Sequence, residues 1–248
     1  MNSIGDPVRI AMWSGPRNIS TAMMRAWETR TDTTVSDEPF YGYYLERTGA
    51  DHPGRDEIIA SMAIDWRQIM REITGPVPGA RTVWYQKHMT HHILPEVEKN
   101  WLHHLRNCFL IRDPHEVVVS YERVRPNATA EDLGYPQQAE IFAAVRRELD
   151  PVPPVLDSAD VLADPERCLT ALCGALGLPF SADMLSWPPG PRSTDGVWSR
   201  YWYANVEAST GFGSGRSTKP DLSRAQAELA AACMPHYEVL RECRIGIN

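Results

Sequence analysis

Short apolar runs alternate with segments of helical periodicity along the chain, and this alternation restricts the possible folds more than any other feature. The runs that we interpret as buried strands are residues 8–13, 33–36, 81–87, 108–111 and 154–156. Helical patterns cover residues 19–30, 56–73, 114–124, 137–149 and 221–240, and residues 157–177 are expected to form a loop and a helix. The alternation predicts an α/β fold with a central parallel sheet flanked by helices, whose ligands bind at the carboxyl ends of the strands.

The domain organisation is expected to be simple. The 248 residues show no internal repeat and no low-complexity tract, which favours a single domain over residues 1–248. Residues 190–220 lack periodicity and are rich in Gly, Ser and aromatic residues, so we expect a long loop or lid there. No feature indicates an oligomeric state.

Charge and cysteine usage narrow the classes of partner and compartment. The chain carries 25 Lys+Arg against 32 Asp+Glu, a net charge of −7, which argues against a broad nucleic-acid surface. The five cysteines form no C-x-x-C pair, as expected for reduced core thiols of a cytoplasmic protein. No basic-then-apolar leader opens the sequence and no apolar run reaches the length of a membrane span, so we expect no membrane partner.

The stretch SGPRNIST, residues 14–21, lies between the first predicted strand and the first predicted helix, where phosphate-binding loops occur. Against the Walker A pattern, Ser20 replaces the second glycine, Thr21 the lysine and Ala22 the magnesium-binding hydroxyl. Amide groups at a helix N-terminus attract anions without that lysine, so we expect an anion less charged than ATP with magnesium. The predicted binding residues are Gly15, Pro16, Arg17, Asn18, Ile19, Ser20 and Thr21. From this loop alone, a simple helix cap at Ser20 is an equally good interpretation.

A second strand-to-helix junction is CFLIRDPHEVVVSYERV, residues 108–124. Arg112 ends the predicted strand, and Ser120 follows eight residues later, about two turns into the helix, so both are expected to grip one phosphate. The spacing of Arg112, Pro114, Ser120 and Tyr121 resembles the 3′-phosphate motif of sulfotransferases that use 3′-phosphoadenosine 5′-phosphosulfate (PAPS). The loop GPRNIST resembles their 5′-phosphosulfate loop.

Other stretches extend this resemblance over nearly the whole chain. DEPFYGYYL, QKHMTHHIL, DGVWSRYWYANVEASTGF and MPHYEVLRE are similar to a sulfotransferase-like branch that is sometimes labelled "branched-chain aminotransferase-like". The resemblance implies a three-layer P-loop NTPase-like fold, PAPS as co-substrate without a metal, and sulfuryl transfer to a small hydroxyl or amine acceptor. It also implies that Arg216 and Lys219 reach the 3′-phosphate, with solvated loop cations as the alternative. Nothing in the sequence suggests a pyridoxal-phosphate lysine site.

Two other functions remain as alternatives at this point. One is an ATP-using P-loop kinase or hydrolase, against which the missing Walker lysine argues. The other is a non-catalytic nucleotide-binding protein of the same fold.

Three residues are candidates for the catalytic chemistry. Lys87 ends a predicted strand and is expected to neutralise the leaving oxygen. The relatives carry K-x-H here, whereas this chain has Lys87 followed directly by His88, which places the histidine one residue out of register. Glu38, in DEPF, is the competing general base and the one we favour, with Asp37 a weaker candidate. His88 and His92 have no obvious third ligand, so zinc is not expected.

Overall fold

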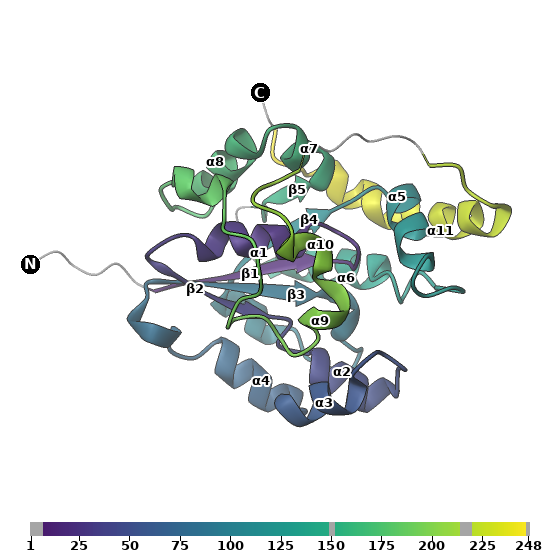
Figure 1. Cartoon of the computed structure of the whole chain (residues 1–248), viewed down its shortest axis with the longest axis horizontal. Coiled ribbons are helices and arrows are strands. Elements are labelled where there is room, and N and C mark those ends of the chain that lie inside the picture. The colour runs from purple at the N-terminus through teal and green to yellow at the C-terminus, as the bar shows by residue number, and fades with distance from the viewer. Residues whose placement is uncertain (1–6, 149–151, 214–219, 247–248) are drawn as a thin grey trace, which may run out of the picture.

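The structure is a computed structural model that describes residues 7–148, 152–213 and 220–246. Five parallel strands form a central sheet in the order β2–β3–β1–β4–β5, with helices on both faces (Figure 1). The strands are β1 (Val8–Ser14), β2 (Thr33–Asp37), β3 (Val83–Met89), β4 (Arg106–Ile111) and β5 (Val155–Asp157). The predicted α/β fold with a parallel sheet between helices is confirmed.

The two faces of the sheet bury alternate side chains of each strand, as the two-residue period of a strand requires. On β1, Ile10 and Met12 pack on one face, and Ala11 and Trp13 pack on the other. The first face is covered by α1 (Ser20–Glu28) and α8 (Pro165–Ala175), and the second by α4 (Trp66–Ile73), α6 (Tyr135–Glu148) and α11 (Arg224–Arg241). Each large apolar side chain buried in this way contributes roughly 1.5–3 kcal/mol.

Shorter elements complete the described chain. The helices are α2 (Tyr41–Thr48), α3 (Arg55–Ser61), α5 (Pro114–Glu122), α7 (Ser158–Ala163), α9 (Ser199–Trp202) and α10 (Ala204–Glu207). The 3₁₀ turns are η1 (Pro78–Ala80), η2 (Thr90–His92), η3 (Asn100–His104) and η4 (Ala182–Leu185). Two of the helices, α9 and α10, lie within the segment that was expected to be a long loop. No helix in the described ranges is long and apolar enough to cross a membrane.

The helix expected over residues 56–73 is two helices. The chain becomes extended at Met62, with φ −133° and ψ 160°, and α4 starts anew after Asp65, whose carboxylate accepts the N–H of Arg67 at 2.9 Å. The apolar spacing continues across this break, because both helices bury a face, and it therefore hides the interruption. Helix α2 was not expected from the sequence, because its aromatic residues and Gly42 are poor helix formers.

Strand β3 runs two residues further than expected. Its last residues, His88 and Met89, pair in register with Trp13 and Ser14 of β1. Lys87 and His88 therefore both lie within a regular strand, and their side chains point to opposite faces of the sheet.

Candidate active site

A cavity of about 470 Å³ opens at the carboxyl ends of the strands. Its walls come from the loop after β1, the ends of β2 and β3, the β4–α5 junction, and the segment that contains α9 and α10. The residues predicted for the site that line it are Pro16, Arg17, Asn18, Ile19, Ser20, Thr21, Glu38, Lys87, Arg112 and Ser120. Gly15 and His88 do not line the cavity, and Arg216 and Lys219 lie outside the described residues.

The loop between β1 and α1 is fixed by its own side chains. A Cβ atom on Gly15 would lie 2.5 Å from the carbonyl oxygen of Leu133, so only glycine allows this close approach. The side chain of Asn18 donates to the carbonyl of Leu110 at 3.1 Å and accepts the N–H of Ile19 at 2.8 Å. Gly15 therefore supports the loop from behind, and Asn18 ties it to β4.

Helix α1 begins at Ser20 without a side-chain cap. Ile19 occupies the N-cap position and makes no side-chain hydrogen bond to the first turn. Ser20 is itself the first helical residue, which removes the interpretation that it merely caps the helix. Backbone N–H groups of an uncapped first turn are available to an anion, and the helix dipole favours negative charge there.

Two arginines and a serine form the wall next to this helix start. The Nε atom of Arg17 donates to the hydroxyl of Ser120 at 3.0 Å, and Arg112 donates to the backbone oxygen of Arg17 at 2.8 Å. Arg112 also pairs with Glu116 at 2.9 Å. Burial, and then the positive charge of Arg112, lowers the pKa of Arg17. A bound anion would relieve this unfavourable charge. Arg112 and Ser120, which were predicted to hold one phosphate, are connected through Arg17, and all three residues line the cavity.

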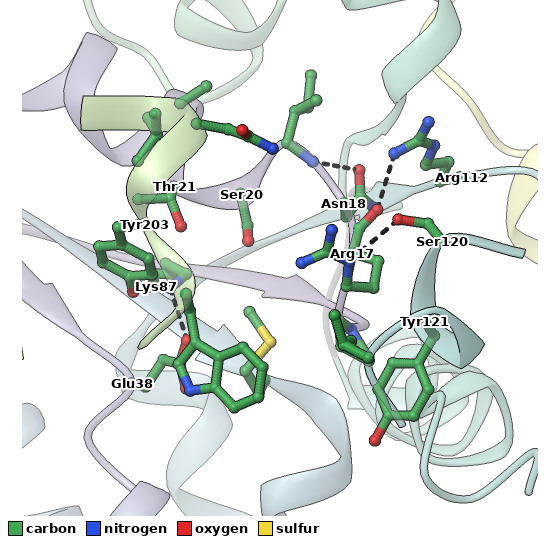
Figure 2. A pocket seen from close by; sticks show the side chains of 18 of the residues that line it. Arg17, Asn18, Ser20, Thr21, Glu38, Lys87, Arg112, Ser120, Tyr121 and Tyr203 are labelled. Carbon is green, nitrogen blue, oxygen red and sulfur yellow. Dashed lines mark hydrogen bonds and ion pairs between the residues drawn. The ribbon is translucent and has the colours of Figure 1, made fainter. Parts of the chain in front are cut away.

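A buried ionic cluster forms the opposite wall. The Nζ atom of Lys87 lies 2.8 Å from Oδ1 of Asp37, 2.6 Å from Oε1 of Glu38 and 2.6 Å from the hydroxyl of Tyr203. Tyr203 in turn donates to Asp37 at 2.7 Å and accepts from the indole of Trp198 at 3.2 Å. In Figure 2 the hydroxyls of Ser20 and Thr21 lie between this cluster and the Arg17–Ser120 wall.

The three hydrogens of the Lys87 ammonium are all directed at oxygen acceptors. Burial alone would lower the pKa of Lys87, but Asp37 and Glu38 outweigh it and raise the pKa well above its usual value. Burial raises the pKa of Glu38, with Asp37 adding to the effect and Lys87 opposing it. Lys87 and Glu38 both line the cavity, and Lys87 could donate to a leaving oxygen only by giving up one of its bonds to Asp37, Glu38 or Tyr203.

His88 lies away from this site, in the core. Its ring stacks on Trp13 with centroids 4.5 Å apart, and its Nε2 atom lies 3.1 Å from the side-chain oxygen of Gln86. Burial lowers the pKa of His88 to about 3. The structure thus does not bring His88 to the other candidates, because β3 continues through Met89.

The segment before α9 is anchored to the site by residues that sequence reasoning missed. Asp195 forms a buried bidentate ion pair with Arg25 of α1, at 2.6 and 2.7 Å, and the N–H of Gly196 donates to Asp37 at 3.3 Å. The bond between Tyr203 and Lys87 was not foreseen from the sequence either. No sequence signal links Asp195 to Arg25, which is 170 residues earlier.

Within the described ranges, no group of three or more His, Cys, Asp or Glu side chains is placed to hold a metal ion.

Comparisons with known proteins identify the class to which this fold and site belong. The chain belongs to the sulfotransferase domain family, whose family model matches residues 8–244. The resemblance drawn from the sequence motifs is therefore confirmed.

Two curated proteins of Arabidopsis thaliana are similar over most of the chain. The chain is 33% identical over 238 residues to the "branched-chain-amino-acid aminotransferase-like protein 1" and 32% identical over 232 residues to the "branched-chain-amino-acid aminotransferase-like protein 2". These matches cover 96% and 94% of this chain but only 42% and 41% of the two relatives, so the chain spans less than half of their length.

Solved structures share the fold. The sulfotransferase domain of the curacin biosynthetic pathway matches with a TM-score of 0.51 and 16% identity, over 92% of this chain and 98% of that one. The sulfotransferase domain of the Synechococcus PCC 7002 olefin synthase gives 0.53 and 15%, over 92% and 94%. A sulfotransferase from Alicyclobacillus acidocaldarius gives 0.52 and 14%, over 96% and 97%. At these identities the likeness concerns the fold alone.

Proposed function

We propose that the protein is a PAPS-dependent sulfotransferase that transfers a sulfuryl group to a hydroxyl or amine of a small acceptor. One observation carries this proposal. The uncapped start of α1 and the wall of Arg17, Arg112 and Ser120 meet in one cavity with a buried Lys87–Glu38 pair. The two anion sites suit the two phosphate positions of PAPS, and Glu38 suits the activation of an acceptor.

The part of the cavity where the donor PAPS would bind, next to α1, also has apolar walls. Ala22 of α1, Leu162 of α7 and Phe212 line it, and Phe212 packs edge-on against Trp187 with centroids 5.1 Å apart. A purine ring fits such a surface, and Phe212 supplies an aromatic contact for it.

In the proposed step, Glu38 acts as the general base. It accepts the proton of the acceptor hydroxyl while the acceptor oxygen forms a bond to sulfur and the bond from sulfur to the phosphate oxygen breaks. The products are the sulfated acceptor and adenosine 3′,5′-bisphosphate (PAP). Lys87 positions Glu38, and the amide groups of the first turn of α1, together with Arg17, stabilise the charge that grows on the leaving phosphate.

Calorimetric titration tests this proposal against an ATP-using enzyme. PAP should bind in buffer with EDTA, because the residues of the loop provide no Walker lysine and no magnesium-binding hydroxyl. ATP with magnesium should bind much more weakly. Binding of ATP with magnesium and none of PAP would contradict the proposal.

A further inference from the structure

Beyond Glu38, the cavity is lined by four side chains that carry rings, which together we call the aromatic wall. Tyr41, His52, His92 and Trp202 all line this end. The ring of Tyr41 stacks on His92 with centroids 4.7 Å apart, and its hydroxyl lies 2.7 Å from Nδ1 of His52. His52 in turn meets Trp202 edge-on at 6.3 Å. Flat aromatic surfaces of this kind favour a ligand that itself contains a ring.

A cation stands at the same end. Arg125 lines the cavity, is half-buried, and donates through Nη1 to the backbone oxygen of Asp51 at 2.9 Å. Over residues 7–148, 152–213 and 220–246, no carboxylate forms an ion pair with Arg125. Lys87 differs, since Asp37 and Glu38 already neutralise its charge. A guanidinium without an acidic partner at a cavity wall is suited to bind a carboxylate with two parallel hydrogen bonds.

The histidines around Arg125 do not share this positive charge. Burial, with Arg125 adding to it, lowers the pKa of His52 to about 4. Burial, with His52 adding to it, lowers the pKa of His91 to about 3. Both rings are neutral near pH 7. The Nδ1 atoms of His91 and His92 are buried without a hydrogen-bond partner among the described residues. Arg125 thus carries the positive charge at this end, where Asp132 and Asp51 oppose its effect on the pKa of His52.

Tyr41 lies in the electric field of both Glu38 and Arg125. Burial raises the pKa of Tyr41, Glu38 raises it further, and Arg125 opposes this effect. Glu38, Tyr41 and Arg125 line the same cavity, and both charged groups act on the Tyr41 hydroxyl. A ligand in contact with all three would present a hydroxyl to Glu38, a ring to Tyr41 and a negative charge to Arg125.

We propose that this end of the cavity binds an aromatic hydroxy acid, with its hydroxyl toward Glu38, its ring against Tyr41 and its carboxylate on Arg125. The assignment rests on the proposed function only for the role of Glu38. The binding of the acid itself depends on Arg125 and the aromatic wall.

Two probes that differ only in charge test this assignment. 4-Hydroxyphenylacetate and 4-hydroxyphenylacetamide share the ring and the hydroxyl, and each is titrated into the protein with and without saturating PAP. We expect the acid to bind at least about 10-fold more tightly than the amide, on the scale of one charged hydrogen-bonded pair. Arg125→Gln should abolish this preference, and Arg125→Lys should retain part of it.

Arg123→Gln is the matched control. Arg123 is exposed, lies two residues earlier on the same helix end and does not line the cavity, so its loss should preserve the preference for the acid. The PAP affinity should stay the same in Arg125→Gln and Arg125→Lys, and the melting temperature should fall by no more than the loss of the hydrogen bond to the backbone of Asp51 explains. Equal affinities for acid and amide, no binding of either, or an equal loss in Arg123→Gln would overturn the assignment. Failure of PAP to bind would instead contradict the proposed function, because the comparison without PAP still reports on Arg125.

Discussion

Lys87 and His88 are neighbours on β3, yet their side chains lie in two regions with opposite chemistry. On the cavity side, Lys87 is surrounded by Asp37, Glu38 and Tyr203 and keeps its charge. On the core side, burial without a charged partner keeps His88 neutral against Trp13. Both residues are about equally buried, at 1% exposure, so burial alone does not distinguish a functional group from a structural one. The partners that other elements supply make the difference.

The largest effect should come from removing the proposed base on the cavity side. Glu38→Gln should lower the rate of sulfuryl transfer by about 10²–10⁴-fold, the usual contribution of a general base, while PAP affinity changes little. Because burial raises the pKa of Glu38, the wild-type rate should fall on the acid side at a pH above the usual 4.5. That acid limb should be missing in the variant. Steady-state kinetics over a pH series checks both points, and a variant with wild-type turnover would rule Glu38 out as the base.

Removing Lys87 should lower the stability of the protein much more than removing one partner of an exposed ion pair. Lys87→Met leaves Asp37 and Glu38 buried without their cation, which should lower the free energy of unfolding by about 3–5 kcal/mol. The ion pair of Lys99 with Glu140 provides the control, because Glu140 is 62% exposed and such pairs contribute about 0–1 kcal/mol. Urea denaturation of Lys87→Met and Lys99→Met measures the contrast. Equal losses would mean that the buried cluster is no more than an ordinary surface pair.

At the nucleotide end, Arg112→Ala should cost about 2–4 kcal/mol of PAP affinity through loss of a charged partner of the 3′-phosphate. Ser120→Ala should cost less, since it removes a neutral hydroxyl. Affinity for adenosine 5′-phosphate, which lacks the 3′-phosphate, should stay close to that of the wild type. A parallel loss for both nucleotides would show instead that Arg112 acts by holding the backbone of Arg17.

The smallest predicted effect is that of His88, on the core side of β3, on the stability of the protein. It appears only at acid pH. The pKa of His88 is about 3 in the folded state against 6.5 unfolded, so below about pH 6.5 the unfolded chain binds more protons and stability falls as the pH decreases. At pH 5 the contribution of this one residue is about 2 kcal/mol. In His88→Gln, the loss of stability between pH 7 and pH 5 should shrink by that amount, with turnover at pH 7 within about 10-fold of wild type. An unchanged pH dependence would mean that burial does not shift the pKa of His88 away from its unfolded value.

Most of the fold was predictable because its signals are local. Apolar runs and helical periods gave every strand of the sheet to within two residues, and motif spacing led to the loop after β1 and to Arg112 and Ser120. The break at Met62 was not predictable, since the apolar pattern continues through it. The position of His88 depended on where β3 ends, and the pairing of β3 with β1 sets that end.

The polar partners of the cavity were the hardest features to predict. Tyr203 reaches Lys87 across 116 residues, and Asp195 reaches Arg25 across 170. Neither contact leaves a periodic or spaced trace in the sequence, because both depend on how the segment before α10 crosses the sheet. Asp37 was the weaker base candidate in the sequence, and in the structure it is the residue that connects Lys87, Tyr203 and Gly196.

A crystal structure with PAP bound tests the central claim most directly, namely that the two anion sites and Glu38 form one active site. The 3′-phosphate should lie on Arg112 and Ser120, the 5′-phosphate on the amide groups at the start of α1, and the carboxylate of Glu38 should face the 5′ end. His88 should remain stacked on Trp13. A PAP molecule bound elsewhere, or one whose 5′ end points away from Glu38, would show that these residues do not form one active site.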